Sequence, residues 1–268
     1  MTPLTMAYSP CPNDTFMFHD VAAGGFARSG YTVTTHLHDV ETLNQLALRG
    51  TYDLTKVSFH TYLLIREQYQ LLNAGAALGF GCGPLLVAKK TIPRSELPRC
   101  RVAIPGELTT AHLLLRLWAP AIHEKRFAPY DRVMDMILGG EADCGIIIHE
   151  TRFVYQDAGL TCLMDLGQWW EQETGYPIPL GCIVARKSLG SSMINDLELL
   201  IRNAIRRSFA NPGETTGYVG SHAQEISRTV QEQHIRMFVN DFSLDLGEVG
   251  QAAIVKLAEM ARQAGIIT

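Results

Sequence analysis

The sequence has no excess of positive charge, because 23 lysines and arginines are outnumbered by 27 aspartates and glutamates and the formal net charge is −4. Charged residues make up only 19% of the 268-residue chain. Nucleic-acid recognition requires a concentrated set of lysines and arginines facing the phosphates. We therefore predict that the protein has no nucleic-acid partner.

Long apolar runs are also missing, since none approaches the roughly 18–20 residues that span a bilayer. The first residues lack the basic segment and the long apolar segment that make up a secretory signal. We expect a cytoplasmic protein with no membrane partner.

Cysteine is sparse and scattered, with six residues, no Cys-x-x-Cys pair and no histidine beside them at metal-ligand spacing. A disulfide framework or a structural zinc site would cluster its cysteines. Cys144 and Cys182 lie inside apolar runs, which is typical of reduced, buried thiols. The pattern predicts a reducing compartment and no metal site.

Several motifs of common enzyme classes are absent. The chain contains no P-loop, no GxGxxG after a predicted strand, no HExxH and no GxSxG. These absences argue against nucleotide, nicotinamide, zinc-protease and serine-hydrolase chemistry.

Short β-like runs instead alternate with helical stretches, the pattern of an α/β fold with a largely parallel sheet. Asp39 stands where an N-cap belongs for a helix over 40–49, and Gly50 is placed to end it. Three longer helical patterns complete the chain, over 194–211, 221–238 and 247–264.

One stretch of the chain is repeated. The segment 48–53, LRGTYD, has a counterpart at 138–143, LGGEAD, and each leads directly into an apolar strand. Upstream of each copy we expect a strand, a polar loop and a helix. Because open α/β sheets bind ligands beyond the carboxyl ends of their strands, two such units would face each other across a cleft. The alternative is that the order helix, glycine, aspartate, strand is common at the boundaries of elements in any α/β fold and indicates no repeat.

His149 follows the apolar run 145–148, at the end of a strand expected to be buried on both faces. An imidazole there has an ordinary pKa of about 6.5, which suits a general base. The alternative is a histidine that only hydrogen-bonds a loop carbonyl. The other eight histidines fall mostly on helix or strand faces, where we expect packing or solvation.

Hydroxyl and charged residues stand at the ends of other predicted strands. Thr109 and Thr110 open a helix whose hydroxyls and free N–H groups would bind an anion, although ordinary N-capping is the simpler interpretation. Ser58 and Lys56 end an earlier strand, where Lys56 either pairs with a carboxylate ligand or is solvated. Together these positions predict one anionic ligand, and the partner that we expect is a small, carboxylated molecule.

The loop 9–15, SPCPNDT, is dense in turn residues. Asn13 or Asp14 is placed to cap the first helix, and Ser9 to face the cleft. The pair Trp169-Trp170 either forms the side of an aromatic pocket or belongs to the core.

Seven motifs, in order along the chain, carry a resemblance to a known enzyme family. They are 9–16 (SPCPNDTF), 39–44 (DVETLN), 55–58 (TKVS), 83–85 (GPL), 105–110 (PGELTT), 146–153 (IIIHETRF) and 165–170 (DLGQWW). From Tyr8 to about Gly247 the chain resembles the 1,4-dihydroxy-6-naphthoate synthases of the futalosine route to menaquinone. The first and sixth motifs are the most specific.

The resemblance implies an α/β, two-lobed, periplasmic-binding-protein-like (type 2) fold with a ligand cleft between the lobes. We place lobe one at residues 1–88 plus 180–268 and lobe two at 89–179, with a hinge at the two crossings. The resemblance also implies a carbon–carbon lyase that needs no cofactor. Its reaction converts cyclic dehypoxanthinyl futalosine to 1,4-dihydroxy-6-naphthoate and a dihydroxyacetone fragment.

The roles of single residues follow from the same resemblance. The family's catalytic base falls on His149. Its substrate-contacting segments fall on five residues of this chain, Lys56, Val57, Ser58, Thr109 and Thr110. We add Ser9 and Asn13, from the loop 9–15, as further expected contacts to the substrate.

Two other functions remain open. A solute-binding protein uses the same two-lobed fold to hold a small aromatic or carboxylate ligand without chemistry, but it is exported and needs a signal or lipid anchor. Chorismate dehydratase of the same pathway shares the fold, and the motifs 9–16 and 149–153 favour the naphthoate synthase over it.

Overall fold

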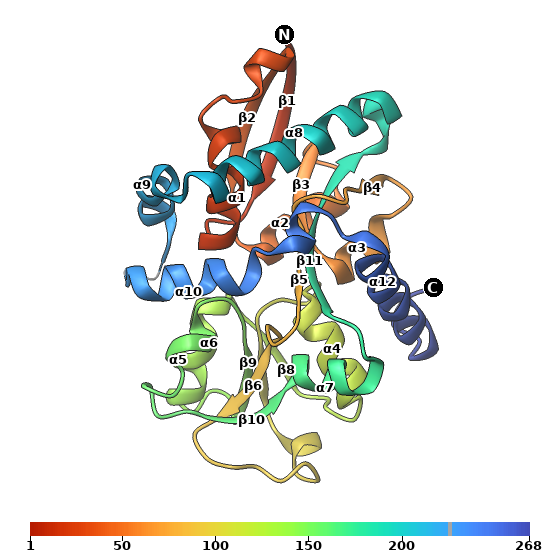
Figure 1. Cartoon of the computed structure of the whole chain (residues 1–268). Coiled ribbons are helices and arrows are strands. Elements are labelled where there is room, and N and C mark those ends of the chain that lie inside the picture. The colour runs from red at the N-terminus through yellow and green to blue at the C-terminus, as the bar shows by residue number, and fades with distance from the viewer. Residues whose placement is uncertain (225–226) are drawn as a thin grey trace.

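Two mixed β-sheets, each flanked by helices, make up the computed structural model, which describes residues 1–224 and 227–268 (Figure 1). The first sheet contains β1 (Thr2–Tyr8), β2 (Tyr31–Leu37), β3 (Leu54–Ser58), β4 (Tyr69–Leu71), β5 (Ala77–Gly79) and β11 (Ile178–Arg186). The second contains β6 (Leu85–Ala88), β7 (Val102–Ile104), β8 (Lys125–Phe127), β9 (Cys144–Ile147) and β10 (Thr161–Asp165).

Two of the long helices near the end of the chain lie where the hydrophobic pattern predicted them, at α8 (Ser191–Ala210) and α12 (Gly247–Gln263). The third, α10 (Arg228–Phe238), begins seven residues later than predicted, because residues 221 and 222 end another helix and 223, 224 and 227 are not helical. Residues 225 and 226 of the predicted helix 221–238 lie outside the described residues. The other helices are α1 (Pro12–Ala22), α2 (Val40–Leu48), α3 (Phe59–Ile65), α4 (Thr110–Trp118), α5 (Val133–Leu138), α6 (Thr151–Val154), α7 (Leu166–Thr174), α9 (Pro212–His222) and α11 (Asp241–Leu244). Short 3₁₀ turns lie at Ala27–Ser29, Leu97–Arg99, Tyr130–Arg132 and Lys187–Leu189.

The two sheets share one internal arrangement. The strand order is β2-β1-β3-β11-β4 in the first sheet, where β5 also pairs with β11, and β10-β6-β9-β7-β8 in the second. Each sheet has a parallel trio, β2-β1-β3 or β8-β7-β9, followed by an antiparallel strand, β11 or β6. The predicted tandem repeat of two α/β units is confirmed, whereas the largely parallel pairing holds only for the trios.

The aspartate that ends each repeated segment accepts an equivalent backbone hydrogen bond in both units. Asp53 Oδ2 accepts the backbone N–H of Thr5 on β1 at 2.9 Å. Asp143 Oδ2 accepts the N–H of Arg101, just before β7, at 2.8 Å. Each carboxylate therefore ties the start of its own strand to the neighbouring parallel strand.

The first lobe boundary needs a correction. The limit at residue 88 assigned β6 to lobe one, but β6 pairs with β9 and β10 in the second sheet. Four apolar residues, all buried, carry no sign of which sheet they join. The chain crosses between β5 and β6, where a Cβ on Gly83 would lie 2.2 Å from the Gly167 nitrogen. With this change, the division into two lobes and the hinge remain predictions.

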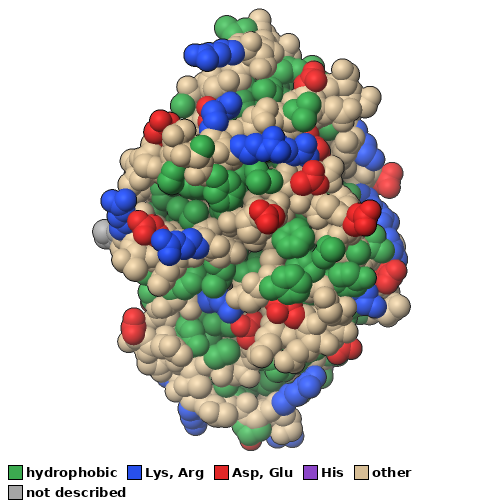
Figure 2. Space-filling view, in the orientation of Figure 1, with side chains coloured by type: hydrophobic (Ala, Val, Ile, Leu, Met, Phe, Trp, Pro, Cys, Tyr) green, Lys and Arg blue, Asp and Glu red, His purple; other side chains and the backbone are tan. Residues whose placement is uncertain are grey.

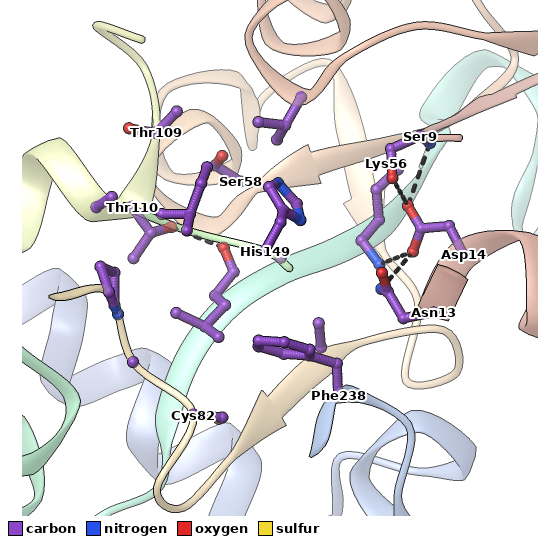
Figure 3. Close-up of a pocket in the computed structure, with 18 of the residues that line it drawn as sticks. Ser9, Asn13, Asp14, Lys56, Ser58, Cys82, Thr109, Thr110, His149 and Phe238 are labelled. Carbon is purple, nitrogen blue, oxygen red and sulfur yellow. Dashed lines mark hydrogen bonds and ion pairs between the residues drawn. The ribbon is translucent and has the colours of Figure 1, made fainter. Parts of the chain in front are cut away.

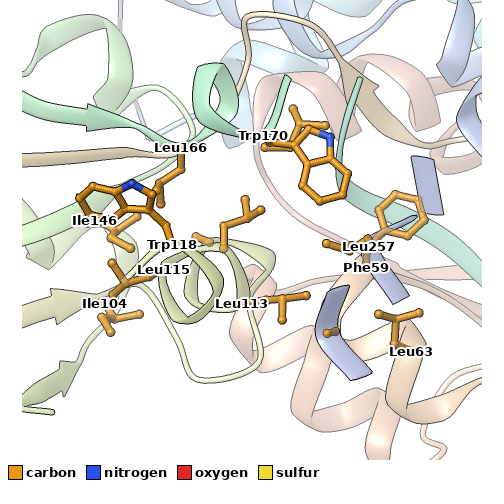
Figure 4. Close-up of a cluster of buried hydrophobic side chains, with 14 of the residues drawn as sticks. Phe59, Leu63, Ile104, Leu113, Leu115, Trp118, Ile146, Leu166, Trp170 and Leu257 are labelled. Atoms are coloured by element: carbon orange, nitrogen blue, oxygen red, sulfur yellow. The ribbon is translucent and has the colours of Figure 1, made fainter. Parts of the chain in front are cut away.

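A continuous apolar core joins the two units (Figure 4). It contains Phe59 from α3, Leu113 from α4 and Leu257 from α12. Trp170 is fully buried in it and donates its indole N–H to the Pro177 carbonyl at 3.0 Å, so the core interpretation of Trp170 is confirmed.

The surface agrees with the low charge of the chain. On the face in Figure 2, lysines and arginines are dispersed among acidic and apolar side chains. Across residues 1–224 and 227–268, no helix combines the length and the apolar character needed to cross a membrane.

Candidate active site

A cleft lies between the two units, lined mainly by segments that follow the carboxyl ends of β1, β3, β7 and β9. Its empty space, measured out to the mouth, is about 720 Å³. All eight predicted site residues line it, namely Ser9, Asn13, Lys56, Val57, Ser58, Thr109, Thr110 and His149. The strand ends of both repeats therefore meet around one cavity, as expected for ligand sites of open α/β sheets.

His149 has an unusual backbone conformation. It stands between β9 and α6 with φ of 56°, and it is the single non-glycine residue with positive φ in the described part of the chain. Side chains other than glycine rarely adopt this region, and such residues cluster at functional sites. This observation agrees with the expectation that His149 is not an ordinary loop residue.

The His149 ring is half-buried beside two other rings. Tyr130 lies 4.9 Å from it between ring centroids, and His234 stacks on it at 6.0 Å with an interplanar angle of 13°. Its nitrogens make no hydrogen bond to any residue within 1–224 or 227–268. Burial lowers the pKa of His149 below its ordinary value of 6.5, against the opposing effect of Glu150. The ring is thus a neutral imidazole near pH 7 with a nitrogen lone pair free to accept a proton.

Lys56 forms a buried ion pair with Asp14, with 2.7 Å between Nζ and Oδ1 (Figure 3). The Asp14 carboxylate also accepts hydrogen bonds from the Ser9 hydroxyl at 2.8 Å and the Asn13 amide at 2.9 Å. Buried charges are tolerated when they are paired in this way. The charge of Lys56 is therefore balanced by Asp14 and the side chain is buried, so the solvated alternative is wrong, whereas its contact with a ligand carboxylate stays a prediction.

The cap predicted for α1 is also wrong. The helix begins at Pro12 with Cys11 at the N-cap position, and no side chain caps it. Asn13 and Asp14 lie two and three residues after the N-cap position, inside the helix, and are buried at the cleft. Asn13 instead links Asp14 to His234, whose Nε2 lies 3.0 Å from Asn13 Oδ1.

The threonine hydroxyls are occupied within the protein. Thr109 is the N-cap of α4, accepting the His112 N–H at 3.2 Å and donating to the Gly106 carbonyl at 3.0 Å. Thr110 donates to the Leu180 carbonyl at 2.8 Å. The simpler capping interpretation of Thr109 is therefore confirmed, and neither hydroxyl is a free donor for a ligand.

Three other donors remain on this side of the cleft. The backbone N–H groups of Thr110 and Ala111 open α4 and find no acceptor among the described residues. The Ser58 hydroxyl accepts from the Asn44 amide at 3.1 Å and keeps its own proton to donate. In the view of Figure 3, His149 lies between Ser58 and the Lys56–Asp14 pair. The arrangement places a base beside a set of donors suited to an anionic oxygen.

Sequence reasoning missed His234 and Glu150. His234 on α10 is fully buried, and its Nδ1 lies 3.6 Å from Glu150 Oε2. The motif around His149 contains Glu150 and was a signal for it. For His234 no local signal exists, because its place on a helix face does not reveal that α10 borders the cleft.

Cys11, His149 and Glu150 bring three possible metal ligands within 4.8 Å of one another. A coordinating cysteine must be a thiolate. Burial raises the pKa of the Cys11 thiol well above its ordinary value, with Glu150 adding to the effect, so a metal ion would have to displace a firmly held proton. Three donors also fall short of a closed structural zinc site. We assign no metal to this cluster.

Comparison with known proteins identifies relatives over nearly the whole chain. Residues 4–263 match a family described as menaquinone biosynthesis. The chain is 43% identical to a 1,4-dihydroxy-6-naphthoate synthase of Thermus thermophilus, covering 99% of this chain and 96% of the relative. It is 40% identical to a synthase of the same name from Streptomyces coelicolor, covering 98% and 94%.

Solved structures agree with the predicted fold. An Archaeoglobus fulgidus protein superposes with a TM-score of 0.92 at 34% identity, covering 99% of this chain and 98% of its own. A Candida albicans protein described as having the generic periplasmic binding protein fold gives 0.71 at 11% identity, covering 100% and 92%. The prediction of a periplasmic-binding-protein-like α/β fold is confirmed.

Proposed function

The chain belongs to the menaquinone biosynthesis family, and on that premise we propose that it is a carbon–carbon lyase. The substrate is cyclic dehypoxanthinyl futalosine, and the products are 1,4-dihydroxy-6-naphthoate and a dihydroxyacetone fragment. The two relatives named above carry the name of this activity. The observation that carries the proposal is the neutral imidazole of His149, which has no hydrogen bond to any described residue and lies in a cleft that also contains anion-binding donors.

His149 is the general base. Its free nitrogen removes a proton from the sugar-derived part of the substrate and becomes an imidazolium. The electron pair released in this step forms a carbonyl group in the departing fragment while a carbon–carbon bond breaks in a retro-aldol-like cleavage. The bonding pair passes to an enolate of the ring system, which takes the proton back from the imidazolium. Aromatisation of the naphthoate ring supplies the driving force. A positioned base of this kind contributes about 10²–10⁴-fold to the rate.

The donors across the cleft bind the negative charge of the substrate. The N–H groups of Thr110 and Ala111 point out of the positive end of α4, and the Ser58 hydroxyl adds a third donor. Donors held in place by the fold stabilise an anionic oxygen without reorganising during the reaction. The Lys56–Asp14 pair contributes a rigid, neutral border to the site rather than a free charge.

One assay tests this function against its alternatives. Purified protein is incubated separately with cyclic dehypoxanthinyl futalosine and with chorismate, and the naphthoate is followed by its absorbance. We expect naphthoate from the first substrate only. Dehydration of chorismate would identify the other pathway enzyme, and tight binding of either compound without turnover would identify a solute-binding protein.

The base is tested in the same assay with His149→Asn, because asparagine tolerates the positive φ of this position. We expect turnover to fall about 10²–10⁴-fold while substrate affinity is largely kept. Turnover within a few-fold of the unmodified protein would remove His149 from the mechanism.

A further inference from the structure

Two buried polar atoms face each other beside His149 without a hydrogen bond. Glu150 Oε2 and His234 Nδ1 lie 3.6 Å apart, and neither has a hydrogen-bond partner within the described part of the protein. Glu150 is 5% exposed and His234 is fully buried, so bulk water does not supply the missing bond. Unsatisfied buried polar groups are costly, and such a pair requires an explanation.

The neighbouring hydrogen bonds decide which nitrogen of His234 carries a proton. The Asp14 carboxylate only accepts, so the Asn13 amide must turn its NH₂ group toward Asp14, at 2.9 Å. The Asn13 oxygen then faces His234 Nε2 at 3.0 Å, and Nε2 must be the donor. In a neutral His234 ring, Nδ1 would consequently turn a bare lone pair toward the Glu150 carboxylate.

A single proton between Glu150 Oε2 and His234 Nδ1 would supply the hydrogen bond that both atoms lack within the described residues. We propose that Glu150 and His234 share a proton between Oε2 and Nδ1, and that this Glu150–His234 dyad positions the catalytic imidazole of His149. The role as positioning residues rests on the function proposed above, whereas the shared proton does not. Complete burial, with smaller effects of His149 and Lys56, lowers the pKa of His234 well below 6.5 at the 3.6 Å separation. A proton at Nδ1 therefore requires a closed hydrogen bond to the Glu150 carboxylate.

The dyad is connected to His149 from two directions. The His234 ring stacks on the His149 ring, and Glu150 Oε1 accepts the Tyr130 hydroxyl at 3.2 Å, while the Tyr130 ring contacts His149. The His149 ring has no hydrogen bond to another residue in the part of the chain that the structure describes, so these contacts orient it. Glu150 follows the strand β9, whereas His234 comes from α10, and the dyad therefore joins distant parts of the chain.

Several other groups bear on the protonation of this site. The titratable and charged residues around the dyad and His149 are Cys11, Asp14, Asp39, Lys56 and Tyr130. Lys56 and Asp14 are paired with each other, and burial keeps the Cys11 thiol and the Tyr130 phenol protonated.

The shared proton is tested by long-range ¹H–¹⁵N NMR of the full-length protein labelled with ¹⁵N-histidine. We expect His234 to show a protonated Nε2 and a strongly downfield, slowly exchanging proton at Nδ1. That proton should vanish in Glu150→Gln, whose amide donates to Nδ1 instead. A bare Nδ1 without a downfield proton in the unmodified protein would overturn the proposal, whatever the protein catalyses.

The positioning role is tested by kinetics of Glu150→Gln and of His234→Gln, which keeps a group able to reach Asn13. We expect kcat to fall about 100-fold, with KM within a few-fold, because the base is misplaced. The acidic limb of the pH profile should also move to higher pH in His234→Gln, which leaves the Glu150 carboxylate beside His149 without its proton-sharing partner, whereas a packing defect alone would leave the limb in place.

His123→Gln, an exposed histidine outside the cleft, is the matched control and should keep both kcat and the pH profile. Unchanged kcat and pH profile in Glu150→Gln and His234→Gln would overturn the positioning role. If the unmodified protein forms no naphthoate, the proposed function fails, and the NMR result still decides whether the dyad exists.

Discussion

Replacing Lys56 by methionine removes one partner of the buried ion pair that lines the cleft. In Lys56→Met, Asp14 keeps the hydrogen bonds from Ser9 and Asn13 but loses the ammonium group 2.7 Å away. The two side chains are only 6% and 2% exposed, so water cannot take the place of the ammonium. Breaking a buried pair in this way costs about 3–5 kcal/mol. Because three hydrogen-bond donors to Asp14 remain, we expect a loss near the lower limit, about 3 kcal/mol.

Two further variants separate the lost charge from the lost packing. Asp14→Asn combined with Lys56→Met leaves no unpaired charge, and we expect it to be more stable than Lys56→Met alone. Arg126→Met is the surface control, because Arg126 pairs with Glu124 where both side chains are about half exposed. It should change stability by less than about 1 kcal/mol.

The assay is urea-induced unfolding followed by far-UV circular dichroism at one pH, which yields the free energy of unfolding. A decrease in the free energy of unfolding below about 1 kcal/mol in Lys56→Met would refute the reasoning, since that is what an exposed surface ion pair contributes. A double variant that is less stable than Lys56→Met would also refute it. In that case the unpaired charge of Asp14 would not be the cause of the lost stability.

Three other predictions concern the active site and the segment between β5 and β6 where the chain crosses from one sheet to the other. Turnover should rise with pH through a value below 6.5 and then level off, because the His149 imidazolium present at lower pH cannot accept a proton; a flat profile across that region contradicts a histidine base. Gly83→Ala should cost about 1–3 kcal/mol in urea unfolding, since its Cβ would overlap the Gly167 backbone, whereas Gly217→Ala in open space should not destabilise α9. Incubation with EDTA should leave naphthoate formation unchanged, and a loss restored by a divalent metal would show that the cleft uses one.

Local features of the fold could be predicted because they depend on residues close together in the chain. The Asp39 carboxylate accepts the N–H groups of Glu41 and Thr42, two and three residues away, and α2 begins where this cap predicted. The repeated segments around Asp53 and Asp143 likewise predicted two similar units. The strand β6 was misassigned because nothing within its four apolar residues identifies the sheet that it joins.

The sequence by itself determined which residues stand at the ends of the strands, and all eight predicted site residues line the cleft. Only the tertiary structure decided what each of them is bonded to. Lys56 meets Asp14 across 42 positions, Thr110 meets Leu180 across 70, and His234 meets Asn13 across 221. A strand end follows from the local pattern of side chains, whereas the partner of a buried charge or hydroxyl depends on how distant segments pack together. The free imidazole of His149 and the occupied threonine hydroxyls are for that reason properties of the fold.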